Sequence, residues 1–369
     1  MPDDSEKRLD PTGQLEPALR ARQEASAAVD LGRLAEWMDG QGFRGEPIAD
    51  AHLLSGGTQN LLLRFRRGGR TFVLRRPPKH LRKNSNETMR REARVLAAIA
   101  DTPVPHPRLI AACPETDVLG VAFYLMEPVE GFNPTLGLPA YHRSDPAIRR
   151  AMGFSLVDSV AALGRVDYRD VGLEGFGRPE GYLERQVVRW RSQLEGYSAF
   201  AGYRGAEIPG VDDVARWLDD NRPADFCPGI IHGDYHLANV MYRSDAAELA
   251  AIVDWELSTI GDPLLDLGWL LATWPAPDAP SAAAVGAAIQ PWDGFPKAEE
   301  LVARYAEGSQ RDVSQIGWYE VLACYKLGII LEGTHARACA GKAPKATGDL
   351  LHATTIGLFQ RALRRVGAS

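Results

Sequence analysis

The spacing of apolar residues changes near residue 128, and this change restricts the fold more than any other feature of the chain. Before it, short strand-like runs surround one helical segment, and Gly68-Gly69 separates two of these runs as in a tight hairpin. After it, segments with helical spacing dominate. Strands grouped before helices favour an α+β architecture. We therefore predict two lobes, a small antiparallel sheet with one main helix at 26–128 and a larger, mostly helical lobe at 129–369, preceded by a mobile tail at 1–25.

Finer patterns place the individual elements. Asp30 is expected to cap a helix, because its side chain can accept the N–H groups that a first helical turn leaves free. Expected strands of the first lobe are 48–54, 61–66, 70–75, 107–112 and 121–126, with a helix at 86–100. Expected helices of the second lobe are 145–164, 179–200, 211–220, 262–274, 297–307, 312–336 and 346–366, with short strands at 229–231, 240–242 and 249–253.

Charge and cysteine content argue against several classes of protein. The 369 residues include 42 Lys or Arg and 48 Asp or Glu, so the formal net charge is 42 − 48 = −6. This balance argues against nucleic acid as the main ligand, because phosphate backbones attract basic surfaces. The four cysteines form no CxxC pair, which is typical of reduced thiols. No signal peptide and no apolar run of about 18 residues is visible, so we expect a cytoplasmic protein without a membrane partner.

The residues that carry chemistry gather around one loop. The pattern His232-x-Asp234-x-x-x-x-Asn239 follows the apolar run Gly229-Ile230-Ile231, and Asp254 follows a later apolar run. Phosphoryl transfer to a hydroxyl needs a carboxylate that orients the hydroxyl, oxygen ligands for Mg²⁺, and cations for the phosphates. Asp234 suits the first role, and Asn239 with Asp254 suits the second. The pattern therefore predicts a phosphotransferase.

The same loop permits a second interpretation. His232-x-Asp234-x-His236 has the residue types of a metal hydrolase, in which a bound metal activates water. That interpretation leaves Asn239 and Asp254 without a role, and the other histidines show no paired spacing. The phosphotransferase is the favoured prediction, and the hydrolase stays open as an alternative.

At these residues the chain resembles the aminoglycoside phosphotransferase family, a branch of the protein-kinase-like fold. The resemblance rests on HGDYHLANVMY and IVDWELSTIGDPLLDLGWL, together with FVLRRPP, TPVPHPRLIAACP and GVAFYLMEPVEG. These stretches are similar to a subgroup whose kinase-like module stands alone or is joined to an acyl-CoA dehydrogenase. The resemblance implies the two-lobed kinase-like fold, with ATP and Mg²⁺ as cofactors.

The resemblance also implies roles for residues of the second lobe. Asp234 is expected to be the catalytic base, or at least the carboxylate that positions the hydroxyl, and His232 to fix the loop. Asn239 and Asp254 are expected to hold Mg²⁺. Asp266 is expected to support the loop from below by accepting backbone N–H groups.

In the first lobe, the resemblance implies a nucleotide-binding surface made of a glycine loop, a hinge and a cation. The residues of the loop and hinge are Gly56, Gly57, Thr58 and Asn60 over the phosphates, and Met126, Glu127 and Val129 beside the adenine. The cation differs from the family pattern, which has lysine where this chain has Arg75. We expect Arg75 to bind phosphate and to pair with Glu92, although arginine and lysine are not interchangeable.

The expected activity is ATP- and Mg²⁺-dependent transfer of the γ-phosphate to a hydroxyl of a small molecule, either an aminoglycoside or a metabolite such as a hydroxyacyl-CoA. The run Arg75–Lys83 is either a solvated basic loop or a second anion site for a phosphate-bearing acceptor. The carboxylates that a polycation would need are spread out and are read as solvated charges, namely Glu307, Asp312, Glu320 and Glu332. The exchange at Arg75 leaves open a nucleotide-binding pseudokinase with a regulatory role. Acceptor identity, ATP versus GTP and oligomeric state do not follow from the sequence.

Overall fold

The computed structural model describes residues 24–54, 60–78, 80–81, 83–205, 207–275 and 288–367. Residues 1–23 of the mobile tail predicted at 1–25 lie outside these residues. Glu24 and Ala25 are helical, and Ala25 is fully buried in the core, so the prediction is wrong for these two residues. The chain divides into two compact units, the first formed by Met1–Ala100 and Pro107–Pro128 and the second by Asp101–His106 and Val129–Ser369.

The segment Asp101–His106 belongs to the second unit, although the sequence pattern groups it with the first. The backbone carbonyl of Pro105 accepts the N–H of Ile252 at 2.9 Å. This bond joins residues far apart in the sequence, a kind of pairing that apolar spacing does not reveal.

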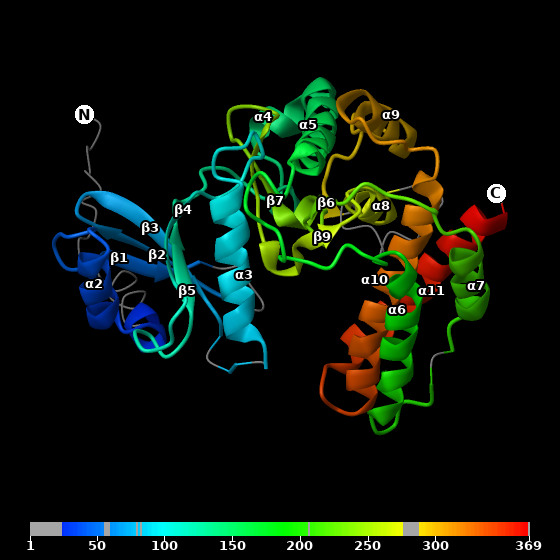
Figure 1. Ribbon diagram of the computed structural model, residues 1–369, viewed down its shortest axis with the longest axis horizontal. Helices are drawn as coiled ribbons and strands as arrows, with labels where there is room; N and C mark the ends of the chain where they lie inside the picture. The colour runs from blue at the N-terminus through cyan, green and yellow to red at the C-terminus, as the bar shows by residue number, and fades with distance from the viewer. Residues whose placement is uncertain are drawn as a thin grey trace, which may run out of the picture. The chain divides into compact units, whose positions relative to one another are not determined.

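The first unit is built on a five-stranded sheet in which every neighbouring pair is antiparallel (Figure 1). The strand order is β1-β2-β3-β5-β4. The hairpin between β2 and β3 closes at Gly68 and Gly69, whose φ angles of 56° and 74° suit glycine. The strands are β1 Ala49–Leu53, β2 Leu61–Arg67, β3 Arg70–Arg76, β4 Leu109–Cys113 and β5 Phe123–Met126.

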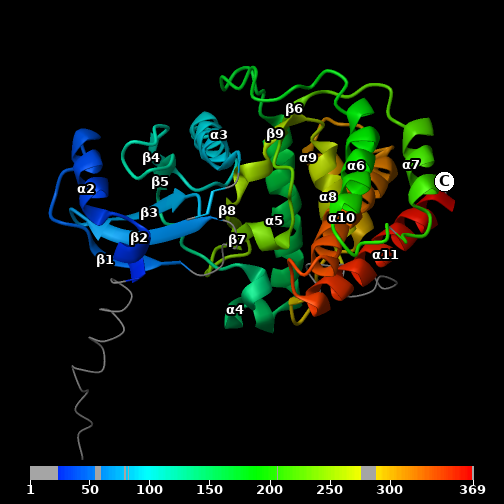
Figure 2. The ribbon, with the colours of Figure 1, turned by 90° about the horizontal axis from the view of Figure 1, so that it is seen from below.

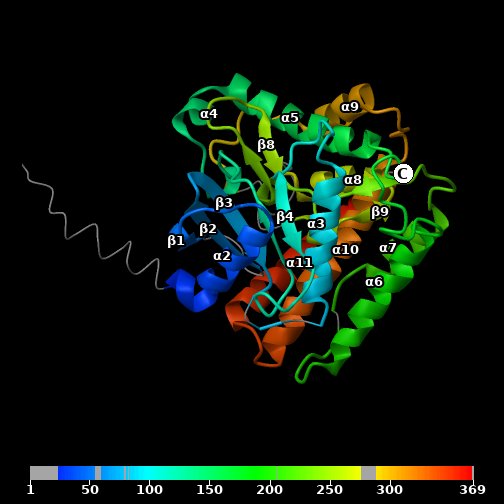
Figure 3. The ribbon, with the colours of Figure 1, turned by 60° about the vertical axis from the view of Figure 1, so that its left-hand side comes forward.

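Two helices of the first unit pack on this sheet. Helix α2, Leu31–Gly40, begins after Asp30, whose carboxylate accepts the N–H of Arg33 at 3.0 Å. Its buried Leu34 and Met38 belong to the same core as the aromatic side chains of β2 and β3. Helix α3, Ser85–Ala98, lies alongside β4 and β5 (Figure 3). The sheet with one main helix on β4 and β5 matches the predicted architecture.

The second unit is mainly helical. Its long helices α10 and α11 lie side by side (Figure 2), α8 packs against α10, and α5 packs against α9. Within the described residues, no helix combines the length and the apolar character that crossing a bilayer requires. The helices are α4 Ala140–Ser144, α5 Pro146–Arg165, α6 Glu184–Gly196, α7 Val211–Asp220, α8 Leu264–Thr273, α9 Ala298–Gly308, α10 Ile316–Cys339 and α11 Lys345–Gly367.

Two small antiparallel sheets accompany these helices. Strand β6, Gly229–Ile231, pairs with β9, Thr259–Gly261, and β7, Val240–Tyr242, pairs with β8, Leu249–Ile252. The sequence pattern does not predict β9, which is only three residues long and follows a loop. The sequence pattern predicts a strand at 249–253, one residue longer than β8, which ends at Ile252.

The close packing of α8 on α10 depends on Gly268. A Cβ at this position would lie 2.7 Å from the backbone carbonyl of Tyr319. Relieving this clash would require one of the two helix backbones to shift. Gly317 lies on α10, the helix of Tyr319, and a Cβ at Gly317 would have nothing within 4 Å. We therefore expect Gly268→Ala to cost roughly 2 kcal/mol or more, as overpacked sites do.

Differential scanning calorimetry can check this expectation. Gly268→Ala should lower the melting temperature of the second unit by about 5 °C. The control Gly317→Ala should leave it unchanged or raise it slightly, because alanine has the higher helix propensity. Equal melting temperatures for the two variants would contradict the packing argument.

Candidate active site

The loop His232–Asn239 connects β6 to β7 and is held at its start by Asp266 of α8. One carboxylate oxygen of Asp266 accepts the N–H of His232 at 2.6 Å, and the other accepts the N–H of Gly233 at 2.8 Å. Burial raises the pKa of Asp266 to about 6, against the opposing effect of the two N–H donors. Gly233 has φ +86°, and a Cβ there would lie 2.6 Å from the carbonyl of Leu257, so the turn requires glycine.

Asp234 is held in place by two side chains of the same loop. The amide nitrogen of Asn239 donates to Oδ2 of Asp234 at 2.9 Å and to its backbone carbonyl at 3.0 Å. His236 accepts the N–H of Ala238 at Nδ1, so Nε2 is the ring nitrogen that can donate to Oδ1 of Asp234, 3.3 Å away. The Asp234 side chain keeps 29% of its surface exposed. Its orientation is therefore fixed while a substrate can still reach it.

These contacts keep Asp234 ionised. Burial alone would raise the pKa of Asp234, but the hydrogen bond from His236, aided by the charge of Lys326, outweighs it and holds the pKa well below the usual range. A carboxylate of this kind is a weak base. It is better suited to orienting a hydroxyl by accepting its hydrogen bond than to removing the proton early.

His232 lies behind the loop with no exposed surface. Its Nε2 donates to the carbonyl of Val253 at 3.0 Å, and burial lowers its pKa, so the ring is neutral. The ring packs edge-on against Tyr235 and Trp255. His232 thus ties the loop to the segment that carries Asp254.

Asn239 and Asp254 lie at neighbouring ends of the β7–β8 pair. Val240 is opposite Ile252, and the N–H of Val253 donates to the carbonyl of Asn239 at 2.9 Å. Asp254 follows in the left-handed conformation, with φ 68° and ψ 60°, which a non-glycine residue adopts at a cost of roughly 1–3 kcal/mol. An amide oxygen and a carboxylate are ligands that suit Mg²⁺. The donor set at this position therefore fits a hard cation.

The alternative metal cluster of a hydrolase finds no support in the loop. The Nε2 of His232 is bonded to a backbone carbonyl, and both nitrogens of His236 face partners within the loop. Binding a transition metal through Nε2 of both imidazoles would break the contacts with Val253 and Asp234. The geometry favours the loop as a holder of Asp234.

In the first unit, Arg75 and Glu92 form a buried ion pair between β3 and α3. Their side chains are 10% and 1% exposed, and Nε of Arg75 lies 2.8 Å from Oε2 of Glu92. The hydroxyl of Tyr124 donates to the same carboxylate at 2.9 Å. The expected pair therefore forms. Contact between Arg75 and a phosphate stays a prediction.

The structure describes only some of the other residues predicted to bind the nucleotide. Gly56, Gly57 and Thr58 lie outside the described residues, whereas Asn60 is partly buried just before β2. In the predicted hinge, Met126 ends β5, and the backbone N–H of Glu127 donates to Arg108 at 2.9 Å. That N–H is therefore already used within the first unit. Val129 is partly buried at the start of the second.

Glu320 and Glu332 correct the sequence interpretation, because they are buried rather than solvated. Glu320 is 2% exposed and forms ion pairs of 2.8 Å with Arg361 and Arg365 of α11. Glu332 is fully buried and accepts the hydroxyl of Tyr203 at 2.8 Å. Their partners are far away in the sequence, so spacing alone suggests isolated charges.

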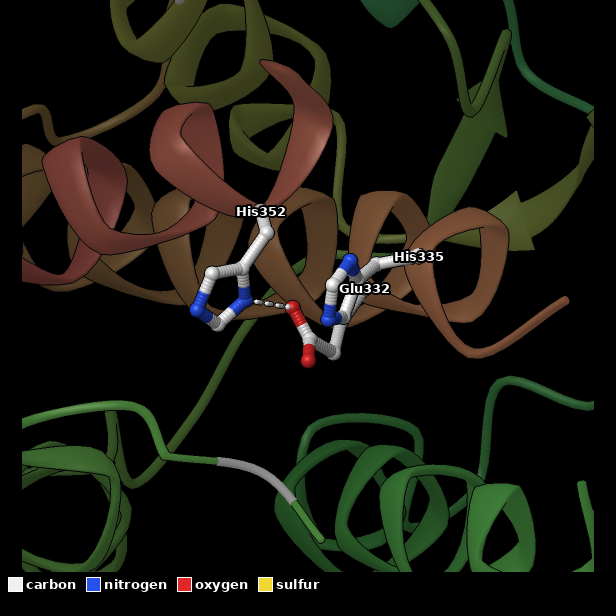
Figure 4. Close-up of side chains that lie close together, drawn as sticks. All are labelled: Glu332, His335 and His352. Carbon is white, nitrogen blue, oxygen red and sulfur yellow. Dashed lines mark hydrogen bonds and ion pairs between the residues drawn. The ribbon is translucent and has the colours of Figure 1, made fainter. Parts of the chain in front are cut away.

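A second group of titratable side chains joins α10 to α11 (Figure 4). Nδ1 of His352 lies 2.8 Å from Glu332, and the ring of His335 stacks on that of His352 at 4.5 Å and 25°. An ion bound by both imidazoles must lie near the plane of each ring, and nearly parallel stacked planes do not meet at bonding distance. We interpret this group as a hydrogen-bonded network between the helices. Sequence spacing does not reveal it.

Comparison with known proteins agrees with this geometry. The family model described as phosphotransferase enzyme family matches residues 50–301. A chicken protein, acyl-CoA dehydrogenase family member 11, is 31% identical over 296 residues, covering 78% of this chain and 37% of its own length. The chain thus spans about two fifths of the length of that curated relative.

Two solved structures are similar in fold. A Ralstonia eutropha protein, provisionally assigned as an aminoglycoside phosphotransferase, has a TM-score of 0.75 at 28% identity, with 91% of this chain and 99% of that chain covered. Aminoglycoside 2'-phosphotransferase-IIIa, solved as its GDP complex, has a TM-score of 0.55 at 14% identity, with 87% and 96% covered. The second likeness concerns the fold alone. With the family model covering most of its length, this chain belongs to the phosphotransferase enzyme family, whose fold is kinase-like.

Proposed function

We propose that the protein transfers the γ-phosphate of ATP, with Mg²⁺, to a hydroxyl group of a small molecule. The observation that carries the proposal is the ionised Asp234, held by Asn239 and His236 in a loop that Asp266 anchors. Phosphoryl transfer needs positioned charge more than covalent chemistry from the protein. A fixed, partly exposed carboxylate beside oxygen ligands for a cation meets that need.

In this mechanism Asp234 accepts a hydrogen bond from the acceptor hydroxyl and thereby orients the hydroxyl oxygen toward the phosphorus. Because Asp234 is a weak base, the hydroxyl proton passes to its carboxylate late, after the bond from the γ-phosphorus to the departing ADP has largely broken, as a loose transition state allows. When bound, Mg²⁺ would neutralise phosphate charge, with Asn239 and Asp254 as its ligands. His232 takes no proton in this scheme, because its ring is buried and its Nε2 donates to the carbonyl of Val253.

Arg75 is the proposed phosphate-binding cation of the first unit. Its guanidinium is oriented by Glu92, and the planar arginine fork matches the geometry of phosphate oxygens. The GDP complex of aminoglycoside 2'-phosphotransferase-IIIa supports nucleotide binding by this fold. ATP is the proposed donor, and GTP is the competitor to be measured beside it.

The acceptor is proposed to be an uncharged or anionic alcohol rather than a polycation. An aminoglycoside needs several available carboxylates, but Glu320 is paired with arginines and Glu332 with Tyr203 and His352. The likeness to an acyl-CoA dehydrogenase family member makes a hydroxyacyl-CoA the first acceptor to assay. The second anion site predicted in the basic run Arg75–Lys83 carries no part of the acceptor proposal, since Lys79 and Arg82 lie outside the described residues.

Asp234→Asn separates this proposal from a nucleotide-binding regulatory module. The amide is isosteric but cannot accept the hydroxyl as a carboxylate does, so we expect turnover to fall by about 10²–10⁴. Nucleotide affinity should stay within about threefold of wild type, because the proposed partner of Asp234 is the acceptor hydroxyl and not the nucleotide. Transfer from labelled ATP and calorimetric binding measure the two quantities. Unchanged turnover would refute the role of Asp234, and nucleotide binding without turnover in wild type would favour the regulatory module.

Asp254→Asn tests the proposed Mg²⁺ ligands. Loss of one anionic oxygen should raise the Mg²⁺ concentration for half-maximal rate by about 10-fold or more, since Mg²⁺ prefers carboxylates. Asp245→Asn is the matched control, because Asp245 lies in the turn that joins β7 to β8, with its side chain 73% exposed and paired with Arg243. A Mg²⁺ titration of the rate distinguishes the two. Identical titration curves would remove Asp254 from the metal site.

Arg75→Met tests the buried ion pair separately from phosphate binding. It would leave Glu92 buried without its cation, and we expect the first unit to lose about 3–5 kcal/mol of stability. The control Arg66→Met removes an exposed pair with Asp50, worth about 1 kcal/mol at most. Urea denaturation followed by Trp37 fluorescence measures both. Equal midpoints for the two variants would contradict the importance of the buried pair.

A further inference from the structure

Helix α10 carries one lysine inside an apolar run, VLACYKLGII at 321–330. Lys326 is partly buried, and its Nζ donates to the backbone carbonyl of Gly233 at 3.0 Å. A lysine stem within such a run normally carries its ammonium toward water. Here the ammonium is directed at the loop that bears Asp234, which makes the contact specific.

The contact with Lys326 completes a clamp on Gly233. Asp266 accepts the N–H of Gly233 at 2.8 Å, and Lys326 donates to its carbonyl. That carbonyl belongs to the peptide group that joins Gly233 to Asp234. Because glycine at φ +86° is conformationally permissive, the orientation of this peptide plane depends on such external contacts. The orientation of this plane determines the position of the Asp234 Cα and therefore the direction of its side chain.

Two indole rings enclose the ammonium of Lys326. Its Nζ lies 4.3 Å from the ring centroid of Trp269 on α8 and 5.6 Å from that of Trp190 on α6. Both distances suit a cation–π interaction, which favours the charged form. The ammonium is therefore held by three elements: α6, α8 and the loop itself.

The space next to Lys326 shows how it acts. A cavity of about 20 Å³, lined by Gly233, Asp266, Trp269 and Lys326 among others, lies beside the ammonium. Such a volume has room for about one water molecule. The ammonium itself bonds to the loop, which is the route by which Lys326 can act on Asp234.

We propose that Lys326 is a positioning residue for phosphoryl transfer, whose ammonium fixes the Gly233–Asp234 peptide group and thereby the direction of the Asp234 carboxylate. The proposal rests on the function proposed above and extends it by one residue. It predicts a defect in the rate of transfer rather than in nucleotide binding.

Lys326→Met keeps the length and apolar packing of the stem but removes the charge and the donor. We expect it to lower kcat by about 10- to 100-fold, as loss of reacting geometry does, with KM for ATP within about twofold of wild type. Lys326→Arg keeps the charge and donors and should recover at least half of the loss on a logarithmic scale. Lys345→Met is the control, because Lys345 is an exposed lysine whose side chain is 83% accessible. Its kcat should equal that of wild type.

The pH profile gives a second readout that a purely structural role would not move. Burial lowers the pKa of Lys326 to about 8, while Asp234 and Asp266 oppose the shift and Arg189 of α6 adds to it. Wild-type kcat should therefore fall as the pH rises through about 8, when the ammonium loses its proton. Lys326→Arg, which stays protonated, should keep its kcat over that range.

The outcomes separate this inference from the proposed function. If wild type transfers phosphate and Lys326→Met does so within about twofold, the positioning role is wrong and the function stands. If Lys326→Met does not fold, the pH profiles of wild type and Lys326→Arg decide, and identical profiles overturn the inference. If wild type transfers no phosphate to any acceptor, both proposals fail together.

Discussion

The paired hydrogen bonds from His232 and Gly233 to Asp266 are the contact on which the candidate site depends. Asp266 stands in the first turn of α8, and α8 is seated on α10 by the close approach of Gly268 to Tyr319. The packing of two core helices is thereby transmitted to the loop that bears Asp234. Charge is buried at this junction at some cost to stability, which is common where a structure holds a reactive geometry.

Much of the fold could be predicted because its signals are local. Asp30 marks the start of α2 by capping it, and Gly68-Gly69 marks the hairpin because both residues accept positive φ. Helices α5 to α11 follow apolar spacing to within a few residues at each end, except that α6 begins five residues after the predicted start. The sequence pattern does not predict the short helix α4. The loop from His232 to Asn239 could also be predicted from the sequence, since Asp234, His236 and Asn239 contact one another within eight residues.

The rest depends on pairs that are distant in the sequence. Lys326 meets Gly233 across 93 positions and Tyr203 meets Glu332 across 129, so neither pair leaves a spacing pattern. Apolar periodicity shows which face of a helix is buried but not which neighbour covers it. One signal was present for Lys326, because a single lysine within a run of apolar residues needs a polar partner inside the fold.

A crystal structure with a non-hydrolysable ATP analogue and Mg²⁺ tests the central claim most directly. The account predicts Mg²⁺ about 2.1 Å from side-chain oxygens of Asn239 and Asp254, touching the phosphates, with the Asp234 carboxylate off the metal and open to an acceptor. A metal bound by His232 and His236, or a nucleotide held away from Asn239 and Asp254, would contradict it.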